Sequence, residues 1–265
     1  MFASTKPIGI DGTIFNQDIG NCDSSSVTNM SYMFYSDINF NQDLSGWCVQ
    51  NIDDQPFWFG QDANSTWVND ETKQPKWGTC PDDSHDSGGS SGHDSGGSSG
   101  QDTTDNTNGS GASSGSGTSG SEGSTSSSVY FENETCKCPN AIVGYTETID
   151  GTVYTVVDNS SIAGQISNGN YNLCTTLVTD MNNLFGGNSS FNLDIGFWDT
   201  SNVTDISAMF SGATSFNKDI NNWDVSKVIY MDNTFKDARS FNKPLNKWNT
   251  SSVTAMYNMF LRATE

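Results

Sequence analysis

Apolar side chains recur along this chain with a fixed period of 25 residues. In the second half, four columns of Phe, Trp, Val and Phe keep one register through three successive periods. The first part of the chain follows the same period, as Phe15 and Phe40 show. A fixed period of about 20–50 residues predicts stacked units that bury their apolar faces only against their neighbours. We therefore predict a repeat core made of Phe191, Trp198, Val203, Phe210, Phe216, Trp223, Val228, Phe235, Phe241, Trp248, Val253 and Phe260.

Each repeat contains two predicted elements. Val203, Ile206 and Phe210 have the spacing of one helix face, and Gly212 is placed to end that helix. Residues 216–220 then predict a short extended segment. We expect the extended segments of successive repeats to pair in parallel. The predicted fold class is therefore α/β, a solenoid of 25-residue rungs with one short strand and one short helix each.

The stretch before the second set of repeats has a different pattern. Residues 145–149 and 152–157 are rich in β-branched residues and flank Asp150-Gly151, which is a strong signal for a β-hairpin. A short helix through Ile162 and Ile166 is predicted next, with Asn159 or Ser160 as its N-cap. We interpret this stretch as a cap over the first repeat.

These patterns divide the chain into four parts. Residues 1–80 are predicted to be a repeat module with its own C-terminal cap, and residues 81–128 a Ser/Gly/Asp-rich disordered linker. Residues 129–176 form the predicted N-terminal cap of a second repeat module, residues 177–265. Because the chain begins and ends inside a repeat, we expect a fragment of a longer protein, with any signal peptide outside it.

The charge balance excludes two classes of partner. The formal net charge is −20, with only 11 Lys and Arg residues. Nucleic acids and anionic membranes are therefore not expected partners, because both require basic patches. No apolar run approaches the roughly 20 residues of a membrane span, so direct membrane insertion is not expected either.

Six cysteines, in a sequence rich in Gly, Ser and Asn, favour an oxidising compartment. Cys48, Cys80, Cys138 and Cys174 lie near the ends of the two repeat arrays, where a cross-link would stabilise an open apolar face, and are the candidates for structural disulfides. Cys136 remains unassigned. Zinc binding by Cys136 and Cys138 is the alternative, but their spacing is one residue rather than two to four, and no histidine is near.

Candidate catalytic groups are sparse. Carboxylate pairs occur at Asp53-Asp54, Asp70-Glu71 and Asp82-Asp83, but their positions in loops indicate solvated charge rather than the two carboxyl groups of a glycosidase. Both histidines, His85 and His93, lie in the predicted linker. We predict no catalytic residue, no metal site and no cofactor.

Polar residues also form columns. The Asn after each repeat Phe predicts a hydrogen-bonded ladder, with a row of sugar or ion ligands as the alternative. The Asp two positions later predicts turn hydrogen bonds, with a calcium row as the alternative. A threonine column, interrupted at Ile229, leaves an ice-binding array as a remote alternative. The columns are Asn16, Asn41, Asn192, Asn217 and Asn242; Asp18, Asp43, Asp194 and Asp219; and Thr28, Thr204 and Thr254.

Residues 216–228, with the sequence FNKDINNWDVSKV, resemble the repeat of BspA-type leucine-rich-repeat-like surface proteins. The chain departs from that pattern at Cys22, which occupies the Trp column, and at Pro244, which replaces the Asp. Cys22 is therefore either free or paired with Cys48. The resemblance implies secreted or cell-surface proteins that act in adhesion and protein binding and have no catalytic residues.

The expected function is non-enzymatic binding of an extracellular protein or glycan through the exposed face of the repeats. Two alternatives remain open: a purely structural spacer in a coat or wall, and the binding part of a larger secreted enzyme. A binding face should carry clustered aromatic side chains or vary between repeats, whereas the surface of a spacer should be monotonous.

Overall fold

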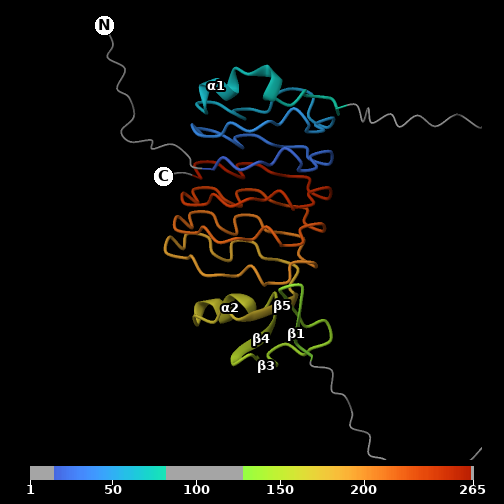
Figure 1. Ribbon diagram of the computed structural model, residues 1–265, viewed down its shortest axis with the longest axis vertical. Coiled ribbons are helices and arrows are strands. Elements are labelled where there is room, and N and C mark those ends of the chain that lie inside the picture. Colours follow the sequence, from blue (N-terminus) through green and yellow to red (C-terminus); the bar gives the residue numbers. More distant parts are fainter. Residues whose placement is uncertain (1–14, 82–127, 264–265) are drawn as a thin grey trace, which may run out of the picture. The chain divides into compact units, whose positions relative to one another are not determined.

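The computed structural model describes residues 15–81 and 128–263. Most of the predicted linker, its two histidines and the pair Asp82-Asp83 lie outside the described residues. Most described residues are coil, with a few short helices and strands (Figure 1). These are α1 (Ser65–Val68), a 3-10 helix (Glu71–Lys73), β1 (Tyr130–Glu132), β2 (Thr135–Lys137), β3 (Thr146–Ile149), β4 (Thr152–Asp158), α2 (Ile162–Ser167) and β5 (Leu173–Leu177).

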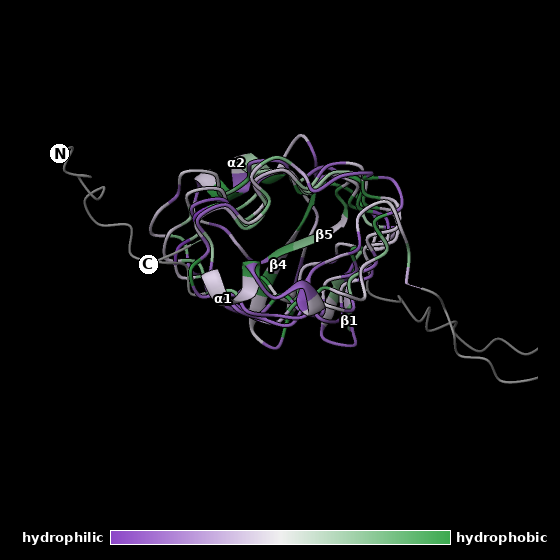
Figure 2. Cartoon of the chain, turned by 90° about the horizontal axis from the view of Figure 1, so that it is seen from above, coloured by the Kyte–Doolittle hydropathy of each residue, from purple (hydrophilic) through white to green (hydrophobic). Residues whose placement is uncertain are grey.

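The predicted hairpin is present in the cap. β3 pairs antiparallel with β4 through a turn in which Asp150 (φ 49°) and Gly151 (φ 80°) both adopt the left-handed conformation. β4 then pairs in parallel with β5. Both strands carry hydrophobic residues (Figure 2), of which Val156 and Leu173 are fully buried.

Helix α2 lies where the sequence predicted a helix, but its start differs. The N-cap is Ser161, which makes no capping hydrogen bond from its side chain. Instead, Asp158 Oδ1 accepts hydrogen bonds from the backbone N–H groups of Ser160 and Ser161. This Asx turn sets the entry into the helix, so the predicted cap at Asn159 or Ser160 was wrong.

The helices predicted inside the repeats are absent among the described residues, and this corrects the strand-plus-helix rung. Ala208 (φ 54°) and Gly212 (φ 73°) both adopt the left-handed conformation. The same two positions are left-handed in every repeat, for example at Asn233 and Asp237. Two left-handed residues four positions apart interrupt a right-handed helix, so the segment forms successive tight turns instead.

The parallel pairing between repeats also lies elsewhere than predicted. Single-residue parallel bridges join Asp180 to Asp205, Asp205 to Tyr230, and Tyr230 to Ala255. They fall in the segment predicted as helix, whereas the segment 216–220, predicted as the strand, is coil. The pairing is thus parallel, as expected, but it is made by isolated bridges and turn hydrogen bonds rather than by strands.

The two sets of repeats share one core. Ala255 is bridged in parallel to Asn29, and the Phe15 and Phe260 ring centroids are 4.1 Å apart. In Figure 1 the segment that starts at residue 15 accordingly lies beside the segment that ends at residue 263. The sequence prediction had treated these sets as separate modules, whereas residues 15–81 and 128–263 belong to one compact unit.

The core is largely aromatic. All twelve residues of the predicted repeat core are buried. Their phenylalanines form two adjoining stacks with nearly parallel rings: Phe210 and Phe216 lie 4.0 Å apart within one repeat, and Phe210 and Phe235 lie 5.6 Å apart between repeats. Offset stacks of this kind add roughly 0.5–1.5 kcal/mol per pair to the gain from burial.

Polar ladders accompany the aromatic core. Asn192 Oδ1 accepts from the Asn217 N–H, and Asn217 Oδ1 accepts from the Asn242 N–H, each at 3.0 Å. The predicted asparagine ladder is therefore present. The Asp column forms turns, as expected: Asp194 Oδ1 accepts from the N–H two residues on, at 3.0 Å.

The tryptophans tie each repeat to the preceding one. The indole N–H of Trp223 donates to the Ile195 carbonyl at 3.2 Å, and that of Trp248 donates to the Ile220 carbonyl at 3.0 Å. Each Trp thus fills the core and satisfies a backbone acceptor of its neighbour.

Candidate ligand-binding surface

An exposed aromatic cluster lies on the last repeats before α1. It consists of Tyr32, Tyr35, Phe57, Trp58 and Tyr257, and we call it the aromatic surface. Phe57 is 61% exposed and Trp58 is 40% exposed, while the three tyrosines are half-buried. Large aromatic side chains are usually buried, so a contiguous exposed group of them marks an interaction site.

The rings of the aromatic surface contact one another. Trp58 lies 5.1 Å from Tyr35, 5.2 Å from Phe57 and 5.6 Å from Tyr32, measured between ring centroids, with interplanar angles of 31–38°. Tyr32 also meets Tyr257 edge to face at 5.8 Å. The rings therefore support one another and form a preorganised apolar platform, which lowers the entropy lost on binding.

Two of these residues have an unfavourable backbone. Tyr32 (φ 58°) and Trp58 (φ 57°) occupy the left-handed position that Asn183, Asn233 and Asn258 occupy in other repeats. A bulky residue in this conformation costs free energy, and such positions gather at functional sites. Trp58 is still 40% exposed, so burial offsets only part of that cost, which favours a role for the ring in binding.

The surroundings of the platform are polar. Asp232 Oδ1 accepts from the backbone N–H of Tyr257 at 2.7 Å, and Asn29 Oδ1 accepts from that of Ser31 at 2.9 Å. Desolvation, with a contribution from the charge of Asp205, raises the pKa of Asp232 above its usual value. The Gln61 side chain donates to Asp62 Oδ1 at 3.1 Å. Acceptors thus border the rings, as in the polar rim of a protein interface.

Sequence analysis missed this surface, although a signal was present. Phe57 and Trp58 stand at columns that hold small or polar residues in other repeats: Phe57 corresponds to Ser207, and Trp58 to Ala208. The detectable feature was a large aromatic residue at repeat positions that hold small or polar residues elsewhere in the chain.

Five of the six cysteines lie towards the two ends of the set of repeats, and Cys22 lies between them beside Leu245 and Trp248. Cys48 and Cys80 form a disulfide, whereas Cys22, Cys136, Cys138 and Cys174 are free thiols. Cys22 therefore does not pair with Cys48. No bond joins the candidates Cys138 and Cys174, although they share a hydrophobic cluster in the cap.

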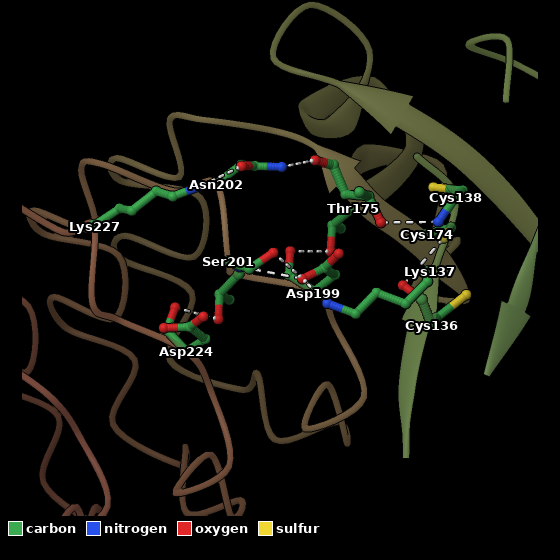
Figure 3. A network of polar contacts seen from close by, with 12 residues as sticks. Cys136, Lys137, Cys138, Cys174, Thr175, Asp199, Ser201, Asn202, Asp224 and Lys227 are labelled. Carbon is green, nitrogen blue, oxygen red and sulfur yellow. Dashed lines mark hydrogen bonds and ion pairs between the residues drawn. The ribbon is translucent and has the colours of Figure 1, made fainter. Parts of the chain in front are cut away.

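A buried polar network joins the cap to the first repeats (Figure 3). Lys137 Nζ lies 2.8 Å from Asp199 Oδ1, which also accepts from the Ser201 hydroxyl at 2.7 Å. Burial alone would raise the pKa of Asp199, but hydrogen bonds from Lys137, Thr176 and Ser201 hold it below its usual value.

The thiols beside this network have raised pKa values. A hydrogen bond with Cys174, followed by burial, raises the pKa of Cys138. A hydrogen bond with Cys136 is the main cause that raises the pKa of Cys174. These thiols are therefore protonated and weakly nucleophilic near neutral pH, which is typical of structural cysteines.

Other features of the described residues add no site. The carboxylates of Asp53 and Asp54 are exposed in a loop, whereas half-buried Asp70 caps the 3-10 helix that exposed Glu71 begins. Within residues 15–81 and 128–263, no cluster of three metal-binding side chains occurs. In the same ranges, no helix has the length and apolar character needed to cross a bilayer.

Comparison with known proteins gives one match. Residues 8–77 and 154–265 match the family model described as Mycoplasma protein of unknown function, DUF285. No curated protein and no solved structure matches the chain. Since the matched residues make up more than half of its length, the chain belongs to the DUF285 family.

Proposed function

We propose that this protein is a non-enzymatic extracellular repeat protein that binds a protein or glycan through the aromatic surface. The observation that carries the proposal is the contiguous exposure of Phe57 and Trp58 beside three half-buried tyrosines. Trp and Tyr are the side chains most enriched in the energetic centres of interfaces. Their flat faces also stack on apolar ring faces such as those of pyranoses.

The proposed architecture is a leucine-rich-repeat-like solenoid of the BspA type. Hydrogen bonds and ring contacts recur at 25-residue separations, for example from Asn217 to Asn192 and from Phe216 to Phe191, and support it. Such stacking leaves long rows of side chains on the surface, so substitutions in a few columns create a binding site without disturbing the core.

The proposed location is the cell surface or the extracellular space. The Cys48–Cys80 disulfide supports it, since structural disulfides persist in oxidising compartments. The net charge of −20 favours neutral or basic ligands over acidic ones.

The structural spacer is the second candidate. The uniform asparagine ladder and the regular Asp turns favour it, since monotonous columns suit a spacer. The aromatic surface breaks that monotony and therefore favours binding. The remaining alternative, the binding part of a larger secreted enzyme, uses the same surface and predicts the same ligand contacts.

A binding experiment with matched variants tests the proposal. The intact chain is applied to immobilised extracellular-matrix glycoproteins and to a panel of neutral and acidic oligosaccharides. We expect binding that falls at least tenfold in Trp58→Asn and Phe57→Ser, which restore the polar residues of other repeats. Tyr145→Ser removes a 42% exposed ring from the cap and serves as control, with unchanged binding.

Two results would contradict the proposal. One is the absence of binding to every probe by a folded chain, which would favour the spacer. The other is binding that Trp58→Asn and Phe57→Ser leave unchanged while both variants keep the circular-dichroism spectrum and melting temperature of the parent chain.

A further inference from the structure

One repeat of the stack is built from both ends of the described chain. In the preceding repeat, Phe235 stacks on Phe241 at 4.1 Å, and Phe260 occupies the position of Phe235 one repeat later. Phe15 takes the place that Phe241 has in the preceding repeat, at the same distance of 4.1 Å from Phe260. Residues 253–263 thus supply the first half of this repeat and residues 15–26 the second half. We use the term seam for the contacts between these two segments, together with the contacts that each of them makes with the adjacent repeat of the other part of the chain.

The hydrogen bonds at the seam reproduce those inside the continuous repeats. The Thr28 N–H donates to the Thr254 carbonyl at 2.9 Å, as the Thr254 N–H does to the Ile229 carbonyl at 2.9 Å. The asparagine ladder also continues across the seam, with the Asn16 N–H donating to Asn242 Oδ1 at 3.4 Å. The seam is therefore an in-register junction without a peptide bond across it.

The seam nevertheless lacks one contact that other junctions have. Cys22 stands where the corresponding repeats carry Trp198, Trp223 and Trp248. The indole that would donate to the Leu245 carbonyl is missing, although the backbone turn is the same: the Cys22 N–H donates to the Ile19 carbonyl at 3.0 Å. An apolar cavity lined by Cys22, Leu245 and Trp248 marks the place of the missing ring.

We propose that the seam is an exchangeable interface, at which residues 15–81 of a second copy of this chain complete the repeat that residues 253–263 begin. The covalent path between the two halves runs only through residues 82–127, so nothing in the contacts distinguishes the same chain from another copy. Exchange of an identical element between copies is an established route to dimers. The junction that lacks an indole is the one expected to open first.

The exchange has a consequence for the aromatic surface. Tyr257 belongs to the first half of the composite repeat, whereas Tyr32 and Trp58 belong to the part that exchanges. An exchanged dimer therefore carries two complete aromatic surfaces, each built from both copies. Two linked sites raise the avidity for a repetitive ligand without any new contact.

Cross-linking between two full-length variants tests the exchange. One variant keeps Cys22, and the other carries Cys22→Ser together with Thr250→Cys, since Cys22 hydrogen-bonds Thr250 across the seam. They are unfolded without reductant, refolded together and oxidised with glutathione disulfide. We expect a mixed disulfide dimer, identified by peptide mass, whose yield rises several-fold as the protein concentration during refolding is raised from micromolar towards millimolar.

The control is a single chain with Cys22 and Thr250→Cys, which should close its own disulfide at low concentration. Closure of this control without any mixed dimer at high concentration would overturn the proposal, because the seam would then form only within one chain. Failure of the control to close would overturn it too, since the seam would not exist. Sedimentation of the unmodified chain adds an independent reading, with dimer expected only after refolding at high concentration.

Discussion

Cys22 shows how one residue changes the stability of a repeat stack. It is half-buried against Trp248 and Thr250, and burial raises the pKa of its thiol to about 12. The Cys22→Trp variant should fill the cavity and donate to the Leu245 carbonyl. We expect it to raise the free energy of unfolding by about 1–2 kcal/mol, measured by urea denaturation.

The matched control is Cys22→Ala, which removes the thiol without supplying an indole and should lower the stability slightly. If Cys22→Trp were as unstable as Cys22→Ala, the cavity could not accept the ring, and the equivalence of Cys22 with the Trp column would be wrong.

The buried carboxyl of Asp37 should make the free energy of unfolding depend on pH. Its carboxyl is buried beside the core, and desolvation raises its pKa from 3.8 to about 8, despite hydrogen bonds from the Phe40 and Asn39 backbone. The folded state therefore holds this proton more tightly than the unfolded state. The resulting stabilisation is complete below about pH 4 and is lost as pH rises towards 8.

We expect the contribution of Asp37 to fall by at most about 1.4 kcal/mol per pH unit in this window. Thermal unfolding of the parent chain and of Asp37→Asn between pH 5 and 8 measures the effect. The variant, which imitates the protonated carboxyl, should show a flatter profile. Identical slopes in both proteins would show that Asp37 does not titrate in this range.

At the scale of elements, the asparagine ladder stabilises each junction between repeats. Asn217 Oδ1 accepts from the Asn242 N–H at 3.0 Å, at a half-buried position. Asn217→Ala should lower the free energy of unfolding by about 1 kcal/mol, because the Asn242 N–H loses its partner. Asn217→Asp keeps an oxygen acceptor and should retain most of the stability. An Asp variant as unstable as the Ala variant would assign the effect to something other than this bond.

The hairpin and the short helix of the cap were predictable from sequence, whereas strands β1, β2 and β5 and the turns of the repeats were not. Asp150-Gly151 forces a turn that only one class of hairpin accommodates, so local chemistry determined β3 and β4. In the repeats, the spacing of Val203, Ile206 and Phe210 suits a helix, but the same three side chains reach the core from a chain of turns. The left-handed conformation of Ala208 excludes the helix and leaves the turns. Alanine on its own favours a helix, so nothing in the sequence indicated this conformation.

The candidate site was hidden for a related reason. An apolar residue in a repeat is normally assigned to the core, and Phe59, one residue beyond Trp58, is indeed buried there. Only its position within the repeat distinguishes buried Phe59 from its exposed neighbours. The spacing is no longer strictly 25 residues after Phe40, so that position could not be read from the sequence. The core columns, by contrast, were predictable because three repeats in succession keep identical spacing.

At the scale of the whole molecule, residues 15–81 and 128–263 form a single hydrogen-bonded unit of repeats. It explains why Phe15, Asn16 and Thr28 contact residues more than 220 positions away. It also places Tyr257 beside Tyr32 in the aromatic surface, which neither part of the chain contains alone.

Amide hydrogen exchange of the intact chain reports directly on whether the repeats of both parts of the chain form one stack. The Thr28, Met256 and Asn258 N–H groups donate across the seam, whereas the Thr204, Met231 and Asn233 N–H groups make the corresponding bonds within the continuous repeats. We predict that the seam amides are protected, with protection factors no more than about tenfold below those of the internal set, because the seam lacks a single indole hydrogen bond. Exchange of the seam amides at unstructured-chain rates, with the internal amides still protected, would contradict the single stack.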